Sequence, residues 1–416
     1  MIRASIITIG DELLIGQVVD TNSAWMAQEL NKIGIWVIHR IAVGDSWTDI
    51  RNALDREAGE AEIILITGGL GPTADDITKP LLSEYFGGKL VVNQDALDNV
   101  KHIFEKVLKR PMIERNYRQA EVPDNCLVIQ NKRGTAPGMW FERNGKNYVS
   151  MPGVPYEMKS MMNDFILPAL KEKFLLPAIV HRTLLLAGIG ESFIAEHIQT
   201  FESALPEHIR LAYLPNYGMV RLRLTATGSE MEKLNSEIEL QFDRLKKLVS
   251  EWLVVDQDLP LEEVIGSLLR KNKQTLSTAE SCTGGFIAHL ITTIPGSSNY
   301  YKGSVVSYSN DVKEDQLLVS RKTLDQDGAV SEATVSQMVA GALSLFKTDY
   351  AIATSGIMGP DGGSEDKPVG TVWIAVGNNR ETITQRMYFR FDRKRNIELT
   401  ATHGLNLLRK FIQAQT

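Results

Sequence analysis

Thirteen residues after an apolar run constrain the fold of this chain more than any other feature. Residues 63–66 are Ile-Ile-Leu-Ile, and a short β-branched run of this kind is typical of a strand buried on both faces. Residues 67–79 then read Thr-Gly-Gly-Leu-Gly-Pro-Thr-Ala-Asp-Asp-Ile-Thr-Lys. The glycines allow a tight turn with a close backbone approach, and the Pro-Thr pair predicts the start of a helix. A buried strand that leads through such a turn into a helix indicates a parallel α/β fold.

The same turn predicts a binding site. Backbone N–H groups at the start of a helix attract anions. Asp75 and Asp76 would repel a bare phosphate, so we expect a divalent cation between these acids and a phosphate. Lys79 is a candidate partner for the phosphate, or for an acid one helical turn earlier. The alternative interpretation is an ordinary strand-to-helix turn whose acids stabilise the helix dipole.

Composition narrows the class of protein. The chain has 416 residues, 43% hydrophobic and 23% charged, which is ordinary for a globular protein of two or three domains. A net charge of -6 argues against a general nucleic-acid binder. Two cysteines, Cys126 and Cys282, are too few for a disulfide framework or a four-ligand zinc site. No apolar run approaches membrane-spanning length and the N-terminus lacks a signal-peptide pattern, so we expect a cytoplasmic protein without membrane contact.

Strand and helix signals alternate at the start of the chain. The predicted elements are strands at 4–9, 35–43 and 63–66 with helices at 21–32 and 47–58 between them. Strands connected in this way pair in parallel with right-handed crossovers, and ligands bind at the carboxyl edge of the sheet. We therefore expect residues 10–12, the 67–79 turn and residues 151–158 to meet at that edge.

Four sequence blocks together resemble one known domain. They are GDELLIGQVVDTN (10–22), TGGLGPTADDITK (67–79), GTAPG (134–138) and MPGVPYEM (151–158). In this order they resemble the N-terminal domain of the CinA family, which is similar to the molybdopterin-binding fold, a three-layer α/β domain. The resemblance implies a pyrophosphatase that cleaves ADP-ribose to AMP and ribose 5-phosphate with Mg, Mn or Co, and potassium is a further candidate ion. The older alternative is a pterin-binding or competence-associated domain.

On this resemblance residues 1–174 form the first domain, with Asp75 and Asp76 as metal ligands. The residues implied to bind its substrate are Gly10, Glu12, Asp20, Asn22, Gly68, Gly69, Gly71, Lys79, Pro152, Gly153 and Glu157. Arg115, Asn116 and Gln119 match a further family stretch and are candidates for lining the nucleotide site. The simpler interpretation of each exposed acid is a solvated side chain.

Residues 175–256 have a different predicted order of strands and helices. A strand, a helix, two strands and a long helix are predicted at 181–187, 192–204, 209–214, 219–227 and 230–252. This order resembles the small KH-like α+β domain between the two halves of CinA proteins. The long helix carries the acids Glu230, Glu232, Glu237, Glu239 and Asp243. Their charge has the wrong sign for a phosphate backbone, so we interpret the segment as an interdomain spacer that binds no nucleic acid.

Residues 257–416 carry a second set of blocks. They are AESCTGG (279–285), PGSS (295–298), YSNDVK (308–313), ATSGIMGPDGG (353–363), PVGTV (368–372) and DRKR (392–395). These blocks resemble the C-terminal domain of the CinA family, an α/β domain similar to nicotinamide mononucleotide deamidase, so the resemblance spans nearly the whole chain. Hydroxyls and glycines before the helix predicted at 286–292 also indicate a second anion-binding helix start.

Amide hydrolysis needs a nucleophile, a base and donors for the developing oxyanion. Neither a metal-ligand cluster nor a Ser-His-Asp order is evident in this part of the sequence. Lys313 is the candidate base, because partial burial lowers the pKa of a lysine. Ser281 is the preferred nucleophile, Ser298 is an alternative hydroxyl expected in the same pocket, and Cys282 ranks third. The resemblance gives Tyr308 the role of orienting the lysine or donating to the substrate.

The remaining residues of this second site follow from the resemblance. The substrate-binding candidates are Gly284, Gly285, Ser355, Gly356, Arg393 and Arg395, with Ser355 at the ring pocket and Arg393 at the phosphate. The chain departs from the family in three places. Met358 is bulkier than the usual alanine, Phe391 replaces a glycine, and Glu398 stands where the family favours an arginine. Arg395 is the candidate to compensate for that missing arginine.

The sequence therefore predicts a bifunctional hydrolase that recycles pyridine nucleotides. The C-terminal domain is expected to deamidate nicotinamide mononucleotide to nicotinate mononucleotide and ammonia without a cofactor, and the N-terminal domain to hydrolyse ADP-ribose with a divalent metal. The family also implies a homodimer whose partners are small nucleotides and not nucleic acid or membrane. The alternative is a non-enzymatic protein associated with competence or DNA damage, or a pterin-binding protein.

Overall fold

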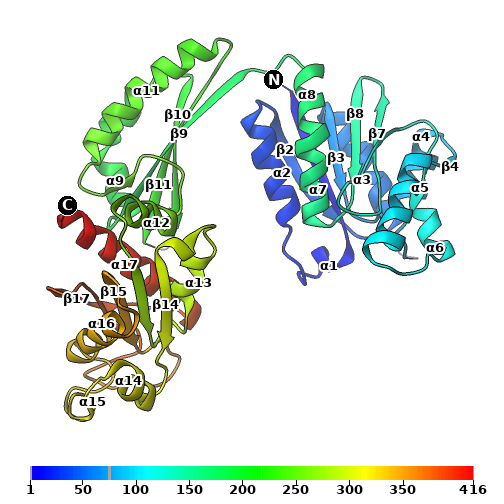
Figure 1. Ribbon diagram of the computed structural model, residues 1–416. Coiled ribbons are helices and arrows are strands. Elements are labelled where there is room, and N and C mark those ends of the chain that lie inside the picture. The colour runs from blue at the N-terminus through cyan, green and yellow to red at the C-terminus, as the bar shows by residue number, and fades with distance from the viewer. Residues whose placement is uncertain (1, 74–75, 217, 416) are drawn as a thin grey trace. The chain divides into compact units, whose positions relative to one another are not determined.

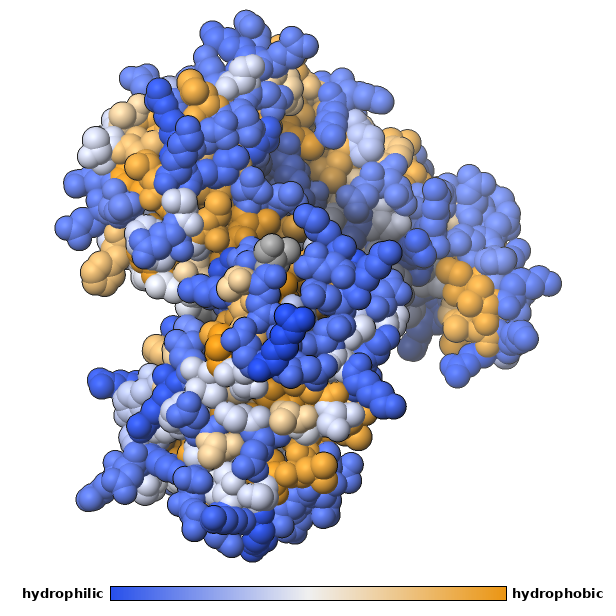
Figure 2. All heavy atoms as spheres, turned by 60° about the vertical axis from the view of Figure 1, so that its left-hand side comes forward, coloured by the Kyte–Doolittle hydropathy of each residue, from blue (hydrophilic) through white to orange (hydrophobic). Residues whose placement is uncertain are grey.

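The chain is a mixed α/β protein of two compact units. The computed structural model describes residues 2–73, 76–216 and 218–415. One unit comprises residues 1–180 with 227–235, and the other comprises residues 181–226 with 236–416 (Figure 1). Among the described residues no helix is both long and apolar enough to cross a membrane. On the face drawn in Figure 2, hydrophobic residues form separate patches among hydrophilic ones.

A six-stranded sheet forms the centre of the first unit. Its order is β2-β1-β3-β8-β7-β6. The strands β2, β1, β3 and β8 pair in parallel, β7 pairs antiparallel with β8, and β6 pairs antiparallel with β7. The bounds are β1 Arg3–Ile9, β2 Trp36–Val43, β3 Ile63–Thr67, β6 Leu127–Ile129, β7 Gly138–Arg143 and β8 Lys146–Met151. The parallel pairing expected from the alternation of strands and helices is confirmed. A separate pair, β4 Leu90–Val92 and β5 Glu121–Pro123, lies outside this sheet.

Helices cover both faces of the sheet. One face packs on α2, α7 and α8, and the other on α3 and α4, each through its own apolar cluster (Figure 1). The bounds in the first unit are α1 Asp11–Leu14, α2 Thr21–Lys32, α3 Trp47–Glu60, α4 Thr78–Phe86, α5 Gln94–Lys101, α6 Glu114–Tyr117, α7 Pro155–Met161 and α8 Leu167–Lys173, with π-helical turns at His102–Val107 and Met162–Ile166. Ile64 and Ile66 are buried on one face and Ile63 and Leu65 on the other, which confirms a strand buried on both faces.

Three strand ends meet at the carboxyl edge of this sheet. The Gly68 amide donates to Met151 O at 3.1 Å. A Cβ on Gly68 would lie 2.2 Å from Ile9 O, and one on Gly153 would lie 3.4 Å from Gly68 Cα. With a φ of +112°, Gly68 adopts a backbone conformation that other residues rarely take. The block residues expected at the carboxyl edge are therefore close together, and Gly68 is required by packing of the backbone itself.

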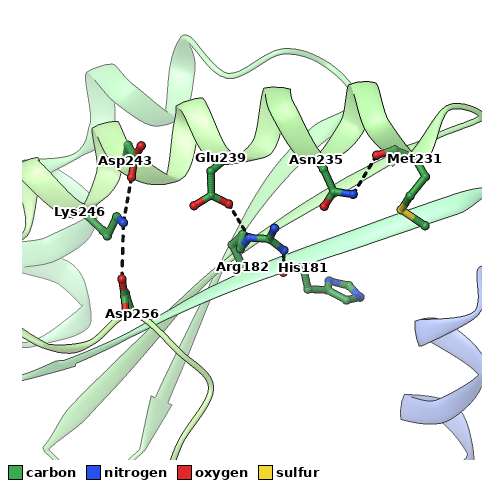
Figure 3. Close-up of polar contacts among 8 residues, drawn as sticks. All are labelled: His181, Arg182, Met231, Asn235, Glu239, Asp243, Lys246 and Asp256. Atoms are coloured by element: carbon green, nitrogen blue, oxygen red, sulfur yellow. Dashed lines mark hydrogen bonds and ion pairs between the residues drawn. The ribbon is translucent and has the colours of Figure 1, made fainter.

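The second unit begins with a small sheet of order β10-β11-β9-β12. The elements around this sheet are β9 Ala178–Ala187, α9 Glu191–His197, α10 Gln199–Ser203, β10 Ile209–Asn216, β11 Met219–Gly228, α11 Met231–Leu248 and β12 Leu253–Val255, of which residues 178–180 and 227–235 belong to the first unit. Acids of α11 pair with basic side chains: Glu239 with Arg182 of β9 at 2.8 Å, and Asp243 with Lys246 of the same helix at 2.9 Å (Figure 3). The β-α-β-β-α order predicted for this segment is confirmed.

A five-stranded sheet of order β14-β13-β15-β16-β17 forms the rest of the second unit. The strands β14, β13 and β15 are parallel, and β16 and β17 are antiparallel. The strand bounds are β13 Leu276–Glu280, β14 Tyr301–Val306, β15 Tyr350–Gly356, β16 Thr371–Gly377 and β17 Thr382–Tyr388. The helix bounds are α12 Leu261–Asn272, α13 Phe286–Thr292, α14 Asn310–Leu317, α15 Arg321–Gln326, α16 Glu332–Phe346 and α17 Arg393–Ala414.

The two sheets of the second unit share one core. Leu185 and Ala187 of β9 and Val254 of β12 belong to the same buried cluster as residues of α12, α13 and α17. The helix α16 covers the opposite face of the large sheet through a second cluster. The small sheet is therefore packed against the C-terminal layers.

Candidate functional sites

A cavity of about 300 Å³ lies at the carboxyl edge of the large sheet. The parallel strands β13, β14 and β15 end beside it, so residues that are far apart in sequence meet there. It is lined by Ser281, Cys282, Tyr308, Asn310, Lys313, Ala329, Val330, Ser355, Gly356, Ile357, Met358, Asp361, Gly362 and Arg393. Six of the residues predicted for this site are among them.

The deepest polar contact in the cavity joins Lys313 and Ser281. Lys313 Nζ donates to Ser281 Oγ at 3.1 Å and to Ser307 O at 2.7 Å. Lys313 is only 1% exposed and Ser281 8%. Burial lowers the pKa of Lys313 from its usual 10.5, which makes the neutral amine more accessible. The lysine follows the N-cap Ser309 of α14, and the serine follows β13, so both positions are fixed by regular structure.

Cys282 does not have the surroundings of a reactive thiol. Its side chain is 5% exposed and packs in an apolar cluster with Met358, Val372 and Ile374. Burial raises the pKa of the Cys282 thiol to about 12. Because the thiolate is the nucleophilic form, burial disfavours Cys282 as the nucleophile. The bulky Met358 contributes both to the cavity wall and to this cluster.

A basic and aromatic pair stands at the cavity rim. Arg393 Nη2 donates to Tyr308 OH at 2.7 Å, and Arg393 Nη1 donates to Gly359 O at 2.7 Å. Tyr308 is 63% exposed and has no contact with Lys313 in the hydrogen-bond network of the described residues. Ser355 is buried and donates to Ala329 O at 2.6 Å. The tyrosine therefore contacts the arginine and not the lysine.

Ser298 lies away from this cavity, contrary to the prediction that it shares the pocket. It is exposed and is not among the cavity residues. Tyr301, three residues later, pairs with Leu276 at the start of β13, whereas Ser281 follows the end of that strand. Parallel pairing therefore puts Ser298 at the amino edge of the sheet, opposite to Ser281.

The helix start after Gly284 and Gly285 is not open to an anion, which corrects a second prediction. The Glu280 carboxylate accepts the backbone N–H groups of Gly285 at 3.0 Å, Ile287 at 3.0 Å and Ala288 at 2.8 Å. Neither glycine is among the cavity residues. Both have positive φ, +61° and +95°, so their part is to shape the turn.

Arg395 also lies outside the Ser281 cavity, so it does not compensate there for the missing arginine. Its guanidinium lies 4.1 Å from the ring centroid of Phe391. It lines a different cavity of about 680 Å³ between the small sheet and the start of α17, together with Glu398. Position 393 faces one side of the helix start and position 395 the other, because they are two residues apart on a helix.

A cavity of about 600 Å³ lies beside the 67–79 turn in the first unit. It is lined by Gly71, Pro72, Thr73, Asp76, Lys79, Pro80, Leu90, Ile113, Glu114, Arg115, Arg118, Gln119 and Glu121. Lys79 is 8% exposed, and its Nζ donates to Gln119 O at 2.7 Å. Burial lowers the pKa of Lys79 to about 8, against the opposing effect of Glu121 and Asp76. The lysine and the two arginines give this cavity the donors that a phosphate needs.

Asp76 accepts hydrogen bonds from its own loop. Gly71 N donates to Oδ1 at 2.8 Å, and Thr73 N donates to Oδ2 at 2.8 Å together with the Thr73 hydroxyl. Asp75 lies outside the described residues. No group of three His, Cys, Asp or Glu side chains suitable for a metal occurs in the described ranges. In the part of the chain that the structure describes, these bonds leave one lone pair of Oδ1 without a contact, so Asp76 has room for one further bond, to a donor or to a cation.

The other residues predicted for the first site hold the sheet edge and do not line the cavity. Asp20 caps α2 by accepting Ser23 N at 2.9 Å, and Asn22 donates to Gly153 O at 2.7 Å. The Glu12 carboxylate folds back over Gly10, since a Cβ on that glycine would lie 2.5 Å from Glu12 Oε1.

Residues of the blocks at 67–79 and 151–158 likewise make contacts within the sheet edge. Thr67 donates to Pro152 O at 2.9 Å, and Glu157 accepts from Asn131 at 2.6 Å. Gly69 packs against Thr78, where a Cβ would lie 2.2 Å from the hydroxyl oxygen. Five of the predicted residues that the structure describes line the cavity, namely Gly71, Asp76, Lys79, Arg115 and Gln119, and Asn116 does not.

Some residues of the two cavities carried no prediction. Asn310 and Asp361 line the Ser281 cavity, and Arg118 and Glu121 line the other. Asp361 was detectable as the acid of a glycine-rich block, and Glu280 as the acid directly before the Ser281 turn. The arginine and glutamate were not, because the loop that carries them approaches Lys79 only through tertiary packing.

The fold and these cavities define a three-part α/β chain: a molybdopterin-binding-like domain, a KH-like domain and a C-terminal α/β domain. Residues 5–172 match the family described as "Probable molybdopterin binding domain", 181–253 the "Damage-inducible protein CinA KH domain" and 258–412 the "CinA C-terminal domain". A CinA-like protein of Cytophaga hutchinsonii is 45% identical over 98% of both chains, and one of Flavobacterium psychrophilum is 43% identical over 99% of this chain and 98% of that one. The chain belongs to the CinA family.

Solved structures are similar to part of the chain. The crystal structure of the competence/damage inducible protein CihA from Agrobacterium tumefaciens is 39% identical and covers 36% of this chain and 91% of its own. Its TM-score is 0.35.

Proposed function

We propose that the second unit hydrolyses the carboxamide of nicotinamide mononucleotide and releases ammonia. The observation that carries the proposal is the buried 3.1 Å contact between Lys313 Nζ and Ser281 Oγ inside a cavity. A lysine whose pKa is lowered by burial is a base strong enough to deprotonate a serine during attack. Membership of the CinA family, whose C-terminal domain the sequence blocks resemble, supports the same assignment.

The contacts of Lys313 suit a base more than a structural cation. A neutral amine has two N–H donors and one lone pair. In the structure Nζ donates to Ser307 O at 2.7 Å and to Ser281 Oγ at 3.1 Å. In the proposed neutral form the N–H to Ser307 O is kept, and the lone pair accepts the proton of the Ser281 hydroxyl. In the described part of the chain no carboxylate pairs with Lys313, so nothing holds it permanently in the charged form.

The reaction then runs through an ester. Ser281 Oγ attacks the carboxamide carbon while Lys313 takes the hydroxyl proton, and the carbonyl π pair moves onto oxygen. When the C=O bond reforms, the C–N bond breaks and the nitrogen leaves as ammonia with the proton from Lys313. Water attacks the ester and gives its proton to Lys313, and the carboxylate product leaves as Ser281 regains a proton.

The cavity rim supports a phosphorylated substrate. The Arg393 guanidinium has five N–H donors, of which two are used by Gly359 O and Tyr308 OH. The remaining donors suit a phosphate at the opposite end of the substrate from the carboxamide. Asp361 is the carboxylate among the cavity residues and suits ribose hydroxyls or the positive pyridinium ring.

The test is ammonia release from nicotinamide mononucleotide by the purified full chain. Ser281→Ala and Lys313→Ala are expected to lose activity, while Cys282→Ala stays active. Loss in Cys282→Ala alone would mean a thiolate mechanism. Absence of ammonia release from the wild-type chain would favour the non-enzymatic alternative, in line with the competence and damage names of relatives.

We further propose that the first unit hydrolyses the phosphoanhydride of ADP-ribose. The supporting observation is the cavity that combines Lys79, Arg115 and Arg118 with the Asp76 loop. In this proposal the basic side chains bind the two phosphates, and Asp76 with Asp75 holds a divalent ion against them. A bound divalent ion supplies charge neutralisation and an activated water. In the structure itself the Asp76 carboxylate accepts the amides of Gly71 and Thr73 and so holds these residues together.

The test is AMP release from ADP-ribose with and without added divalent ions. The double variant Asp75→Ala and Asp76→Ala is expected to abolish AMP release while ammonia release by the same chain continues. Full AMP release in excess chelator, or unchanged turnover in the double variant, would refute the assignment. Because ammonia release is measured in the same preparation, loss through global unfolding is distinguished from loss of the site.

A further inference from the structure

Glu280 is a fully buried acid that takes no part in the mechanism described above. Its side chain is 0% exposed and stands directly before Ser281. Oε2 accepts the amides of Gly285 and Ile287, and Oε1 accepts the amide of Ala288. The Thr278 hydroxyl adds a fourth, longer contact at 3.4 Å. This one carboxylate therefore accepts the amide of the N-cap Gly285 and two amides of the first turn of α13.

The turn between β13 and α13 has a fixed pattern of donors as a result. The Ser281 amide donates to Thr354 O at 2.9 Å, and the Gly284 amide to Ser281 O at 3.2 Å. The Phe286 amide donates to Thr283 O at 3.0 Å. Among the residues that the structure describes, no main-chain carbonyl accepts from the amides of Cys282 and Thr283. Cys282 lines the cavity beside Ser281.

The proposed amide hydrolysis also needs a hydrogen-bond donor for the oxyanion. The oxyanion that forms when Ser281 attacks needs N–H donors close to the nucleophile, and donors held in place before reaction are the most effective. Lys313 Nζ takes the serine proton, and Arg393 lies at the rim. The Cys282 amide is the unused backbone donor next to the attacking oxygen in sequence.

We propose that Glu280 is a positioning residue for acyl transfer: by binding the amide of the N-cap Gly285 and two amides of α13 it fixes the Ser281–Thr283 turn so that the Cys282 amide is presented to the oxyanion. The inference rests on the proposed amide hydrolysis and adds to it the source of oxyanion stabilisation. It also explains why the glycine-rich turn does not bind the substrate phosphate, since its helix amides already have an acceptor within the chain.

The testing variant is Glu280→Gln, which is nearly isosteric. Its amide has one acceptor oxygen and turns the other position into an N–H donor, which faces a backbone N–H. We expect kcat to fall about 100-fold while KM changes less than about twofold, because a donor used only in the transition state is displaced. Glu280→Asp retains both acceptor oxygens at a shorter reach and is expected to recover part of kcat. This variant remains informative if Glu280→Gln does not fold.

The matched control is Asp349→Asn. Asp349 caps the other end of the same strand, accepting from Thr275 N and Thr275 Oγ1 at 2.7 Å each. We expect this variant to lower Tm without changing kcat. If both variants lower Tm and neither changes kcat, Glu280 is only a structural cap and the proposal is wrong.

A second readout separates this proposal from the choice of substrate. The rate at which a fluorophosphonate labels Ser281 depends on the nucleophile and on oxyanion donors but not on a carboxamide. Fast labelling in wild type with a large decrease in Glu280→Gln supports the positioning role even if no ammonia is released. Equal labelling rates in the two proteins overturn it. If wild type neither labels nor releases ammonia, Ser281 is not an activated nucleophile and both proposals fail.

Discussion

The turns at 67–79 and 279–285 each lead from the carboxyl end of a buried parallel strand into a short helix. In each turn an acid of the chain accepts backbone N–H groups that would otherwise attract an anion. Asp76 accepts two amides of its loop, and Glu280 accepts the amide of Gly285 and two amides of α13. A glycine-rich helix start is therefore not sufficient for anion binding, and the charged groups of a substrate must be met by side chains.

The buried lysine beside each turn marks the difference between the two sites. Lys313 Nζ contacts a serine hydroxyl, while Lys79 Nζ contacts the main-chain oxygen of Gln119. The first arrangement suits proton transfer to a nucleophile. The second has no nucleophile among its hydrogen-bond contacts and lies in a cavity with Arg115 and Arg118, which suits a bound phosphate. Similar lysines are thus proposed to act in opposite protonation states.

The largest expected effect comes from removing each lysine in turn. We expect Lys313→Met to lower ammonia release at least about 1,000-fold, because the general base is lost, and to leave AMP release unchanged. We expect Lys79→Met to lower AMP release about 100-fold with ammonia release unchanged, because a charge-assisted contact to phosphate is lost. Both rates are measured on the same preparations. Lys322→Met on α15, exposed and outside both cavities, is the control, and an equal loss of both activities in any variant indicates unfolding.

The second expected effect is an opposite dependence on pH. Lys313 acts when neutral, so ammonia release should rise with pH up to a pKa below the usual 10.5. Lys79 acts when protonated, so AMP release should fall as pH rises through about 8. Each limb approaches about tenfold per pH unit. The measurement is kcat/KM from pH 6 to 10 at constant ionic strength, and two profiles that rise together would remove the distinction between the lysines.

The third comparison is between two arginines of one helix start. Arg393→Ala should raise KM for nicotinamide mononucleotide about tenfold, the cost of about 1.4 kcal/mol from a lost charge-assisted phosphate contact. Arg395→Ala should change KM less than about twofold, because that side chain lies against Phe391 and a different cavity. Steady-state kinetics on both variants decide the matter. A larger effect at Arg395 than at Arg393 would relocate the phosphate.

The sequence was sufficient to predict the parallel strands of both large sheets and the pairing of Ser281 with Lys313 in the second unit. Parallel strands follow from the alternation of strands and helices, and the 279–285 and 308–313 blocks stand at the carboxyl ends of adjacent parallel strands. The sequence did not indicate which backbone N–H groups of a turn already have an acceptor. At the start of α13 that acceptor is the carboxylate of Glu280, on the strand before the turn. The order of the sequence blocks also does not say which edge of the sheet each block reaches. For that reason the prediction that Ser298 shares the cavity of Ser281 was wrong.

The smallest expected effect concerns Ser298. The block that carries it precedes the strand β14, whose first residue pairs with the start of β13, so the serine lies a whole strand away from Ser281. We therefore expect Ser298→Ala to change kcat and KM for ammonia release less than about twofold, which corresponds to under about 0.5 kcal/mol. Ser355→Ala, inside the cavity, is the contrasting variant and should raise KM, because its hydroxyl bonds Ala329 O on the cavity wall. A loss of more than tenfold in Ser298→Ala would show that this serine reaches an active site. Because the strand register excludes the active site of its own chain, that site would belong to another copy of the protein.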